Sequence, residues 1–154
     1  MGGRMNQTVF NSTFETELRI LLLLASAKKK AFALERIVSL DFITCYAGNF
    51  QLPYLNIQGD NQFMYSELGV RRESVQEAIK SLVTQGLLNV GVEDGYVFAI
   101  SDMGTKFIRK LKSEYAKQYK DIAVNVIKRF KDLSDLELDR MLHDSAVKSV
   151  RGGN

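Results

Sequence analysis

Hydrophobic positions recur at helical spacing over two early stretches of the chain. The first runs from about Thr13 to Ala27 and follows Ser12, whose spacing to Glu15 is that of a capping box. The second runs from about Leu34 to Ala47, and the Gly48-Asn49 pair after it is a typical stop signal. We therefore predict two helices in the first third of the chain.

A third apolar stripe is followed directly by two short runs of β-forming residues. The stripe consists of Val75, Ala78, Ile79, Leu82 and Val83. Gly86 predicts the end of this helix, because glycine tolerates the left-handed backbone found there. Residues 87–92 and 96–100 then flank Glu93-Asp94-Gly95, which predicts a hairpin. A helix ended by glycine and followed at once by a hairpin indicates a winged helix-turn-helix.

The last third of the chain carries a long helical pattern. It begins after Ser101-Asp102 and predicts one helix over residues 103–132, roughly 45 Å long at 1.5 Å per residue. A helix of that length exceeds the needs of one small domain, so we expect part of it to pack on a partner, for example as a homodimer. The capping-box spacing of Ser134 and Glu137 predicts one more helix.

These elements predict a mainly α fold with a small β-hairpin (α+β), a winged helix-turn-helix plus long C-terminal helices. We expect an N-terminal extension over residues 1–12, a winged-helix domain over 13–102 and a C-terminal helical extension packed on it over 103–150. Residues 49–63 contain Pro53 and look irregular, which indicates either a functional loop or an interface.

Groups able to perform catalysis are sparse. His143 is the only histidine and Cys45 the only cysteine, and we expect the first at the surface and the second buried. We therefore predict a non-enzymatic protein with no catalytic residue, metal site or cofactor. The lone cysteine favours the cytoplasm, and the longest apolar run, residues 20–25, is far too short to cross a bilayer.

The net charge of the 154 residues is only +3, but the charges are unevenly placed. Residues 104–131 hold nine lysines and arginines against Glu114 and Asp121, whereas residues 132–144 are acidic. The candidate basic surface consists of Lys106, Arg109, Lys110, Lys112, Lys117 and Lys120. Such a surface is either a solvated helix face or a contact for phosphates or an acidic partner.

The segment from Leu68 to Val75, with Leu82 and residues 86–88, resembles the recognition helix of bacterial winged-helix regulators. The resemblance implies a site for DNA or a partner made of Arg71, Arg72, Gln76 and Lys80. Several features oppose a DNA reader: nearby glutamates cancel the cations, the hairpin tip is acidic, and a long loop precedes the helix.

A second resemblance covers more of the chain. Its motifs are Phe10-Asn11-Ser12 with Glu15, Leu18-Arg19, Leu40-Asp41-Phe42, Glu67-Leu68 with Val70-Arg71-Arg72, and Gly86-Leu87 with the hairpin. In this order they resemble the middle-component family of ABC three-component systems, which are bacterial conflict systems of an anti-phage type. The resemblance implies a winged-helix-like adaptor that contacts a separate ABC-type ATPase component.

Two hypotheses therefore stay open. The first is a non-enzymatic adaptor that acts through protein–protein contacts. The alternative is a transcriptional regulator that binds double-stranded DNA as a dimer, held together by the long helix 103–132.

Overall fold

The computed structural model describes residues 12–57, 59 and 64–152, and it is mainly α-helical with a small antiparallel sheet. This confirms the predicted fold class. Apart from Ser12, the expected N-terminal extension lies outside the described residues, as do residues 58 and 60–63 of the predicted irregular segment. In chain order the elements are α2 (Thr13–Ser26), β1 (Phe32–Ala33), α3 (Leu34–Cys45), the short 3-10 helices η1 (Ala47–Phe50) and η2 (Met64–Glu67), α4 (Leu68–Thr84), β2 (Leu88–Val92), β3 (Tyr96–Ile100), α5 (Asp102–Arg109), α6 (Glu114–Arg129) and α7 (Asp135–Gly152).

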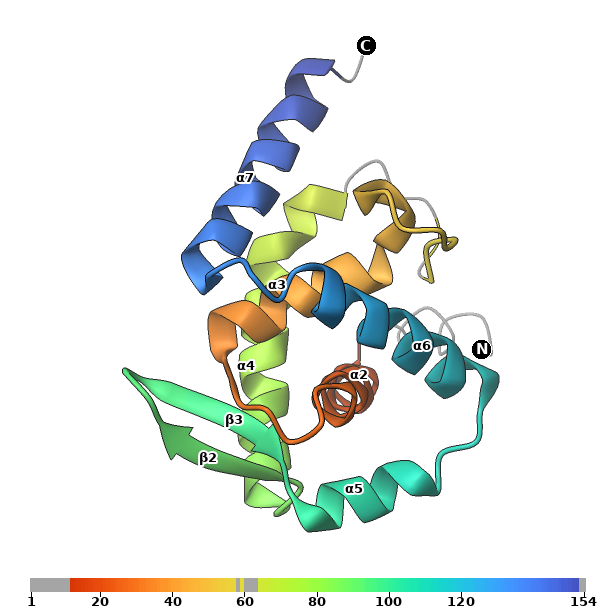
Figure 1. The fold of residues 1–154 in the computed structure, drawn as a ribbon, viewed down its shortest axis with the longest axis vertical. Coiled ribbons are helices and arrows are strands. Elements are labelled where there is room, and N and C mark those ends of the chain that lie inside the picture. Colours follow the sequence, from red (N-terminus) through yellow and green to blue (C-terminus); the bar gives the residue numbers. More distant parts are fainter. Residues whose placement is uncertain (1–11, 58, 60–63, 153–154) are drawn as a thin grey trace.

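Helix α2 forms the centre of the molecule, where α3, α4, α5 and α6 all contact it (Figure 1). Ser12 caps its start by accepting a hydrogen bond of 3.1 Å from the Glu15 amide, as its spacing predicts. The five residues from Ile20 to Leu24 are all buried. A helix that is apolar on every side must be covered on every side, so the leucine run explains the central position of α2.

The sheet contains one more strand than the hairpin that the sequence predicts. Strands β2 and β3 pair in antiparallel register as expected, with Asp94 and Gly95 both at positive φ in the turn between them. The additional strand is β1, whose Phe32 lies opposite Phe98 of β3, so that the strand order is β1-β3-β2. With only two residues, β1 leaves no periodic signal in the sequence.

The predicted single helix over residues 103–132 is wrong. Helix α5 ends at Arg109, and α6 begins only at Glu114, after Ser113 accepts a hydrogen bond of 3.1 Å from the Ala116 amide. The break lets α6 fold back over α2 and α3 and bury Tyr119 within the same chain. Most of the apolar stripe expected to pack on a partner is thus buried within the chain, with Phe107 left 41 % exposed, and no continuous helix is present to join a dimer.

Helix α7 begins with the predicted capping box, in which Ser134 and Glu137 exchange two hydrogen bonds, of 2.9 and 3.1 Å. Arg36 of α3 fixes the preceding turn by donating to the carbonyl oxygens of Phe130 and Leu133. The first half of α7 packs on α3, whereas its C-terminal half extends beyond the other helices (Figure 1).

Residues from β1 to α7 share one hydrophobic core with α2, so the C-terminal helices complete the same core as the N-terminal ones. The segment between α3 and α4 is also part of this core. Phe42 of α3 contacts the rings of Phe50 and Tyr65 at centroid distances of 6.1 and 5.6 Å. None of the described helices combines the length and apolar character that a membrane span requires.

Candidate functional site

Four helices meet at one fully buried carboxylate, that of Asp41 on α3. Arg19 of α2 donates to it from Nε at 3.1 Å, and Arg71 of α4 donates from Nη1 at 2.7 Å. The hydroxyl of Tyr119, on α6, donates to Asp41 Oδ1 at 2.7 Å. We call Arg19, Asp41, Arg71 and Tyr119 the Asp41 cluster; all four side chains are buried.

The electrostatics of the cluster keep Asp41 ionised. Complete burial acts to raise the pKa of Asp41, but the charges of Arg19 and Arg71 outweigh it and lower that pKa to about 2. Burial and the Asp41 charge raise the pKa of Tyr119 well above its ordinary value, so its hydroxyl keeps the proton that it donates.

Arg71 joins the cluster to the surface. Its Nη2 lies 3.8 Å from the carboxylate of Glu67, which also accepts a hydrogen bond of 3.1 Å from the Tyr46 hydroxyl. The guanidinium carbon of Arg71 lies 5.6 Å from the centre of the Phe42 ring, within cation–π range. Arg71 is therefore held from several directions in one orientation.

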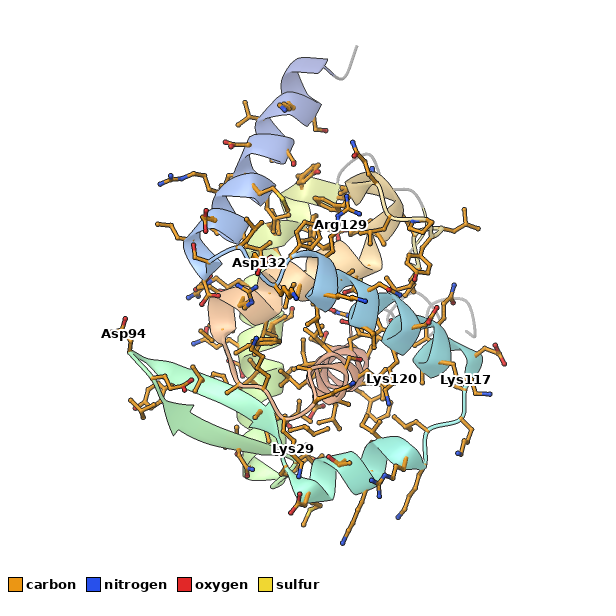
Figure 2. The ribbon with its side chains drawn as sticks, in the orientation of Figure 1. Lys29, Asp94, Lys117, Lys120, Arg129 and Asp132 are labelled. Atoms are coloured by element: carbon orange, nitrogen blue, oxygen red, sulfur yellow. The ribbon has the colours of Figure 1, made fainter. Side chains whose placement is uncertain are left out.

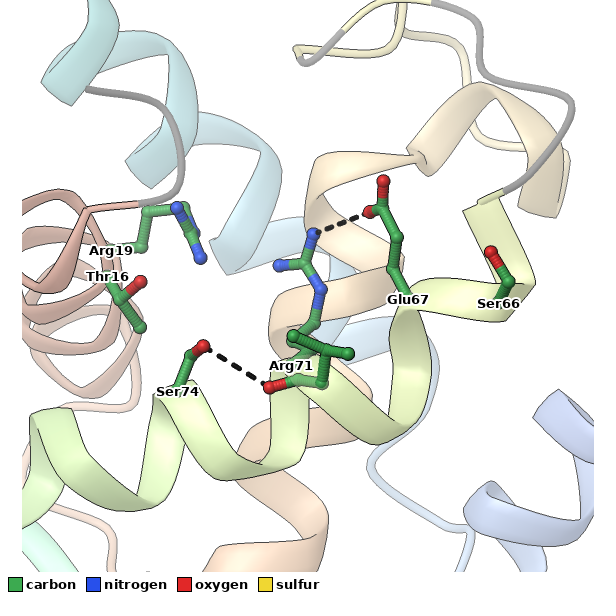
Figure 3. A pocket seen from close by; sticks show the side chains of 7 residues that line it. Thr16, Arg19, Ser66, Glu67, Arg71 and Ser74 are labelled. Carbon is green, nitrogen blue, oxygen red and sulfur yellow. Dashed lines mark hydrogen bonds and ion pairs between the residues drawn. The ribbon is translucent and has the colours of Figure 1, made fainter. Parts of the chain in front are cut away.

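A hollow of about 370 Å³ lies beside the cluster, between the N-terminal ends of α2 and α4 (Figure 3). Arg19 and Thr16 line it from α2, and Arg71 and Ser74 line it from α4. The Ser74 hydroxyl donates to the Val70 carbonyl at 3.2 Å, as the dashed line in Figure 3 shows. The hollow thus lies where both arginines approach the surface.

The four residues predicted to contact DNA or a partner do not form one exposed surface. Arg71 is only 5 % exposed, and its guanidinium forms an ion pair with Asp41. Arg72 is exposed but donates two hydrogen bonds to Glu35 of α3, at 2.6 and 2.9 Å. Gln76 is half-buried, and the ammonium of Lys80 lies 3.8 Å from Glu77. Of the four, Arg71 is the residue whose side chain lies inside the fold.

The predicted basic surface is exposed but divided between two helices. The exposed cations of α5 and of the turn after it are Lys106, Arg109, Lys110 and Lys112, and those near the start of α6 are Lys117 and Lys120. Figure 2 shows Lys117 on α6 far from Asp94, which marks the acidic tip of the hairpin. None of these six cations forms an ion pair with any described residue. They are therefore free to meet anions from outside the chain.

Cys45 and His143 lie where the sequence predicts. Cys45 is buried, and burial together with the Asp41 charge raises the pKa of its thiol to about 11, so that it stays protonated at neutral pH. His143 is exposed on α7 and lies next to Asp139. Within the described ranges, no three side chains of histidine, cysteine, aspartate or glutamate gather as a metal site would require.

Sequence reasoning did not predict the Asp41 cluster, although a signal for it was present. Each member continues the apolar stripe of its own helix: Asp41 lies four residues after Ile37, and Arg71 lies four residues before Val75. A charged residue on a buried stripe requires a buried partner. That requirement links Asp41 to Arg71, but it does not reveal which helices meet.

The cluster also unites motifs that are scattered along the sequence. Arg19, Asp41, Glu67 and Arg71 come from three separate strings of the resemblance to the middle-component family, and the structure places them in contact around one carboxylate.

Comparison with known protein families gives a match over almost the entire chain. The family model described as ABC-three component (ABC-3C) system Middle Component 2 matches residues 9–152, which is nearly the whole chain. No curated protein and no solved structure matches the chain significantly. Because the family match includes every helix and strand described above, the chain belongs to the Middle Component 2 family of ABC three-component systems.

Proposed function

We propose that the chain is a non-enzymatic, winged-helix-like adaptor that acts through protein–protein contacts, with an ABC-type ATPase component among its partners. The main support is that two cations which a DNA reader would present from α4 bind carboxylates of the same chain instead. Arg71 donates to Asp41, and Arg72 donates to Glu35. Membership of a multi-component system supports protein partners.

The order of elements supports the winged-helix-like arrangement. The elements follow in the order α2, β1, α3, α4, β2 and β3, which is the order of a winged helix. As in that fold, β1 pairs with β3. The segment between α3 and α4 departs from a DNA-reading helix-turn-helix, in which a short turn joins the two helices. Here η1, η2 and the residues between them separate α3 from α4.

The surface chemistry favours binding over catalysis. Cys45 is buried and protonated, and His143 lies exposed on α7, so neither pairs with the other as a nucleophile and its base. Large apolar side chains are exposed instead, including Phe14 and Met103, which are 68 % and 59 % exposed. Exposed apolar side chains of this size mark an interaction surface where they gather in a contiguous patch.

The second candidate is a DNA-binding regulator, and one observation favours it. The unpaired cations of α5 and α6 would attract phosphates in any sequence. This attraction alone supports binding to the DNA backbone, not the reading of bases. A dimer would also need a contact other than the single long helix, which the structure does not contain.

Co-expression with the ABC-type ATPase component of the same system tests the proposal. The tagged chain should retain the ATPase through size-exclusion chromatography, and the complex should survive nuclease treatment because DNA does not bridge it. Loss of the complex on nuclease treatment, or no complex with any other component of the system, would contradict the adaptor function.

A further inference from the structure

An apolar groove of about 240 Å³ lies between α2, the C-terminal end of α4 and α5. Its floor contains the buried side chains of Leu21 on α2, Leu82 on α4 and Leu87 in the turn between α4 and β2. Phe14 of α2 and Phe107 of α5 also line the groove and are 68 % and 41 % exposed. Aromatic rings left in solvent around an apolar floor are typical of a binding groove.

The acidic side chain in this groove is already engaged. Glu17 accepts a hydrogen bond of 2.6 Å from the Ser81 hydroxyl and another of 2.9 Å from the Gln85 side-chain amide. Both donors lie on α4 or at its end, so Glu17 fastens α2 to α4. Both donors are neutral and both bind Oε1, so Glu17 keeps its negative charge, and among the described residues the groove lining contains this one acid.

Exposed cations lie on α5 and the turn after it, the segment that contributes Phe107 and Leu111 to the groove. Lys106, Arg109, Lys110 and Lys112 are exposed there, and none of them forms an ion pair with any described residue. The acid at the start of α5, Asp102, lies 3.5 Å from the ammonium of Lys29. The charge beside the groove is thus complementary to an acidic partner.

We propose that this groove binds an acidic segment of a partner component that inserts apolar side chains between Phe14 and Phe107. The apolar residues of the segment would fill the floor, and its carboxylates would meet the cations of α5. This inference rests on the proposed adaptor function and names the chemistry of the partner. It also gives the basic surface of α5 a role that does not involve nucleic acid.

Two pairs of variants test the groove in the complex of the full chain with the ATPase component. Phe107→Asp is matched by Val124→Asp on α6, since both native side chains are 41 % exposed. The double variant Lys106→Glu with Lys110→Glu is matched by Lys128→Glu with Lys131→Glu, at the C-terminal end of α6 and in the turn after it. We expect each groove variant to weaken the complex by about tenfold or more and each control by much less.

The charge variants keep the test valid even if Phe107→Asp disturbs folding, because their native side chains are exposed lysines. Wild-type affinity should also fall as salt is raised, and it should fall less in the Lys106→Glu, Lys110→Glu variant. Retention of the complex in both groove variants would overturn the groove while leaving the adaptor proposal intact. No complex of the wild-type chain with any other component of the system would overturn the adaptor proposal itself.

A photo-reactive residue at Met103, which lies four residues before Phe107 on α5, identifies the occupant. Mass spectrometry of the cross-linked complex should find an acidic segment of the partner component that contains large apolar residues. A cross-link to a second copy of this chain, or to a basic segment, would overturn the proposal. The same probe at Val124 is the control.

Discussion

Arg71 donates a hydrogen bond of 2.7 Å to Asp41, a carboxylate 30 positions earlier in the chain and wholly buried. This contact joins the helix that resembles a recognition helix to the helix before it, and it takes the guanidinium out of reach of any groove of DNA. An arginine at this position of a recognition helix would contact a base, whereas Arg71 stabilises the fold.

Replacement of Asp41 by asparagine should destabilise the protein severely. The amide keeps the shape of the side chain but removes the charge that compensates Arg19 and Arg71, so two buried cations remain. We expect the free energy of unfolding to fall by about 3–5 kcal/mol in urea titrations followed by circular dichroism. The exposed Asp121→Asn should change it by less than about 0.5 kcal/mol. A similar small loss in Asp41→Asn would contradict the role given to this carboxylate.

Removal of the Tyr119 hydroxyl should have a smaller effect of the same sign. Tyr119→Phe deletes the 2.7 Å hydrogen bond to Asp41 and leaves the ring in place, which should cost about 1.5–3 kcal/mol. Tyr96→Phe, at a ring that is 70 % exposed, is the control and should be near neutral. If Tyr119→Phe adds fully to Asp41→Asn in the double variant, the two groups are not coupled.

The pH dependence of stability should show the lowered pKa of Asp41. The ordinary pKa of the side chain is 3.8, and in the folded protein it is about 2, because the charges of Arg19 and Arg71 outweigh the effect of burial. A carboxyl whose pKa is lowered on folding stabilises the protein above the unfolded value and loses that contribution as pH falls through the folded one. We therefore expect the stability difference between wild type and Asp41→Asn to shrink between pH 4 and pH 2. A difference that stays constant over this window would show that Asp41 is not preferentially ionised in the folded state.

A glycine in α5 shows how closely that helix approaches the strand before it. A Cβ at Gly104 would meet the Leu87 carbonyl oxygen and would lie 2.7 Å from Cγ1 of Ile100. Gly104→Ala should therefore destabilise the protein by about 1–3 kcal/mol, measured as a lower melting temperature. Gly69→Ala is the matched control in α4, where the Cβ meets nothing within 4 Å. Because alanine favours a helix, that control should be neutral or stabilising, and equal losses in the two variants would contradict the close approach.

Local signals in the sequence predict much of this fold. The caps at Ser12 and Ser134, the positive φ of Gly86 and the turn at Asp94-Gly95 are fixed by nearby residues, and the structure confirms each of them. The break at Ser113 is different. No glycine or proline marks it, and Ala116 occupies the place where a capping box has glutamate, so the apolar spacing continues across the break.

The site could be predicted only in part, because it depends on contacts between distant residues. The sequence shows Arg71 at the start of an amphipathic helix, where either a surface or a buried position is compatible with its spacing. Arg71 is buried because folding brings Asp41 next to it, where the two side chains form an ion pair. Likewise, the exposed groove at Phe107 depends on how α5 packs against α2 and α4, which no local pattern records.

Whether α4 supports the fold rather than binding DNA is tested most directly by titration of the chain with duplex DNA of random sequence. At about 150 mM salt we expect the chain to bind DNA no more tightly than about 1 µM, and we expect no change in affinity when Arg72 and Lys80 are both replaced by alanine. Submicromolar, steeply salt-dependent binding that is lost in this double variant would contradict it.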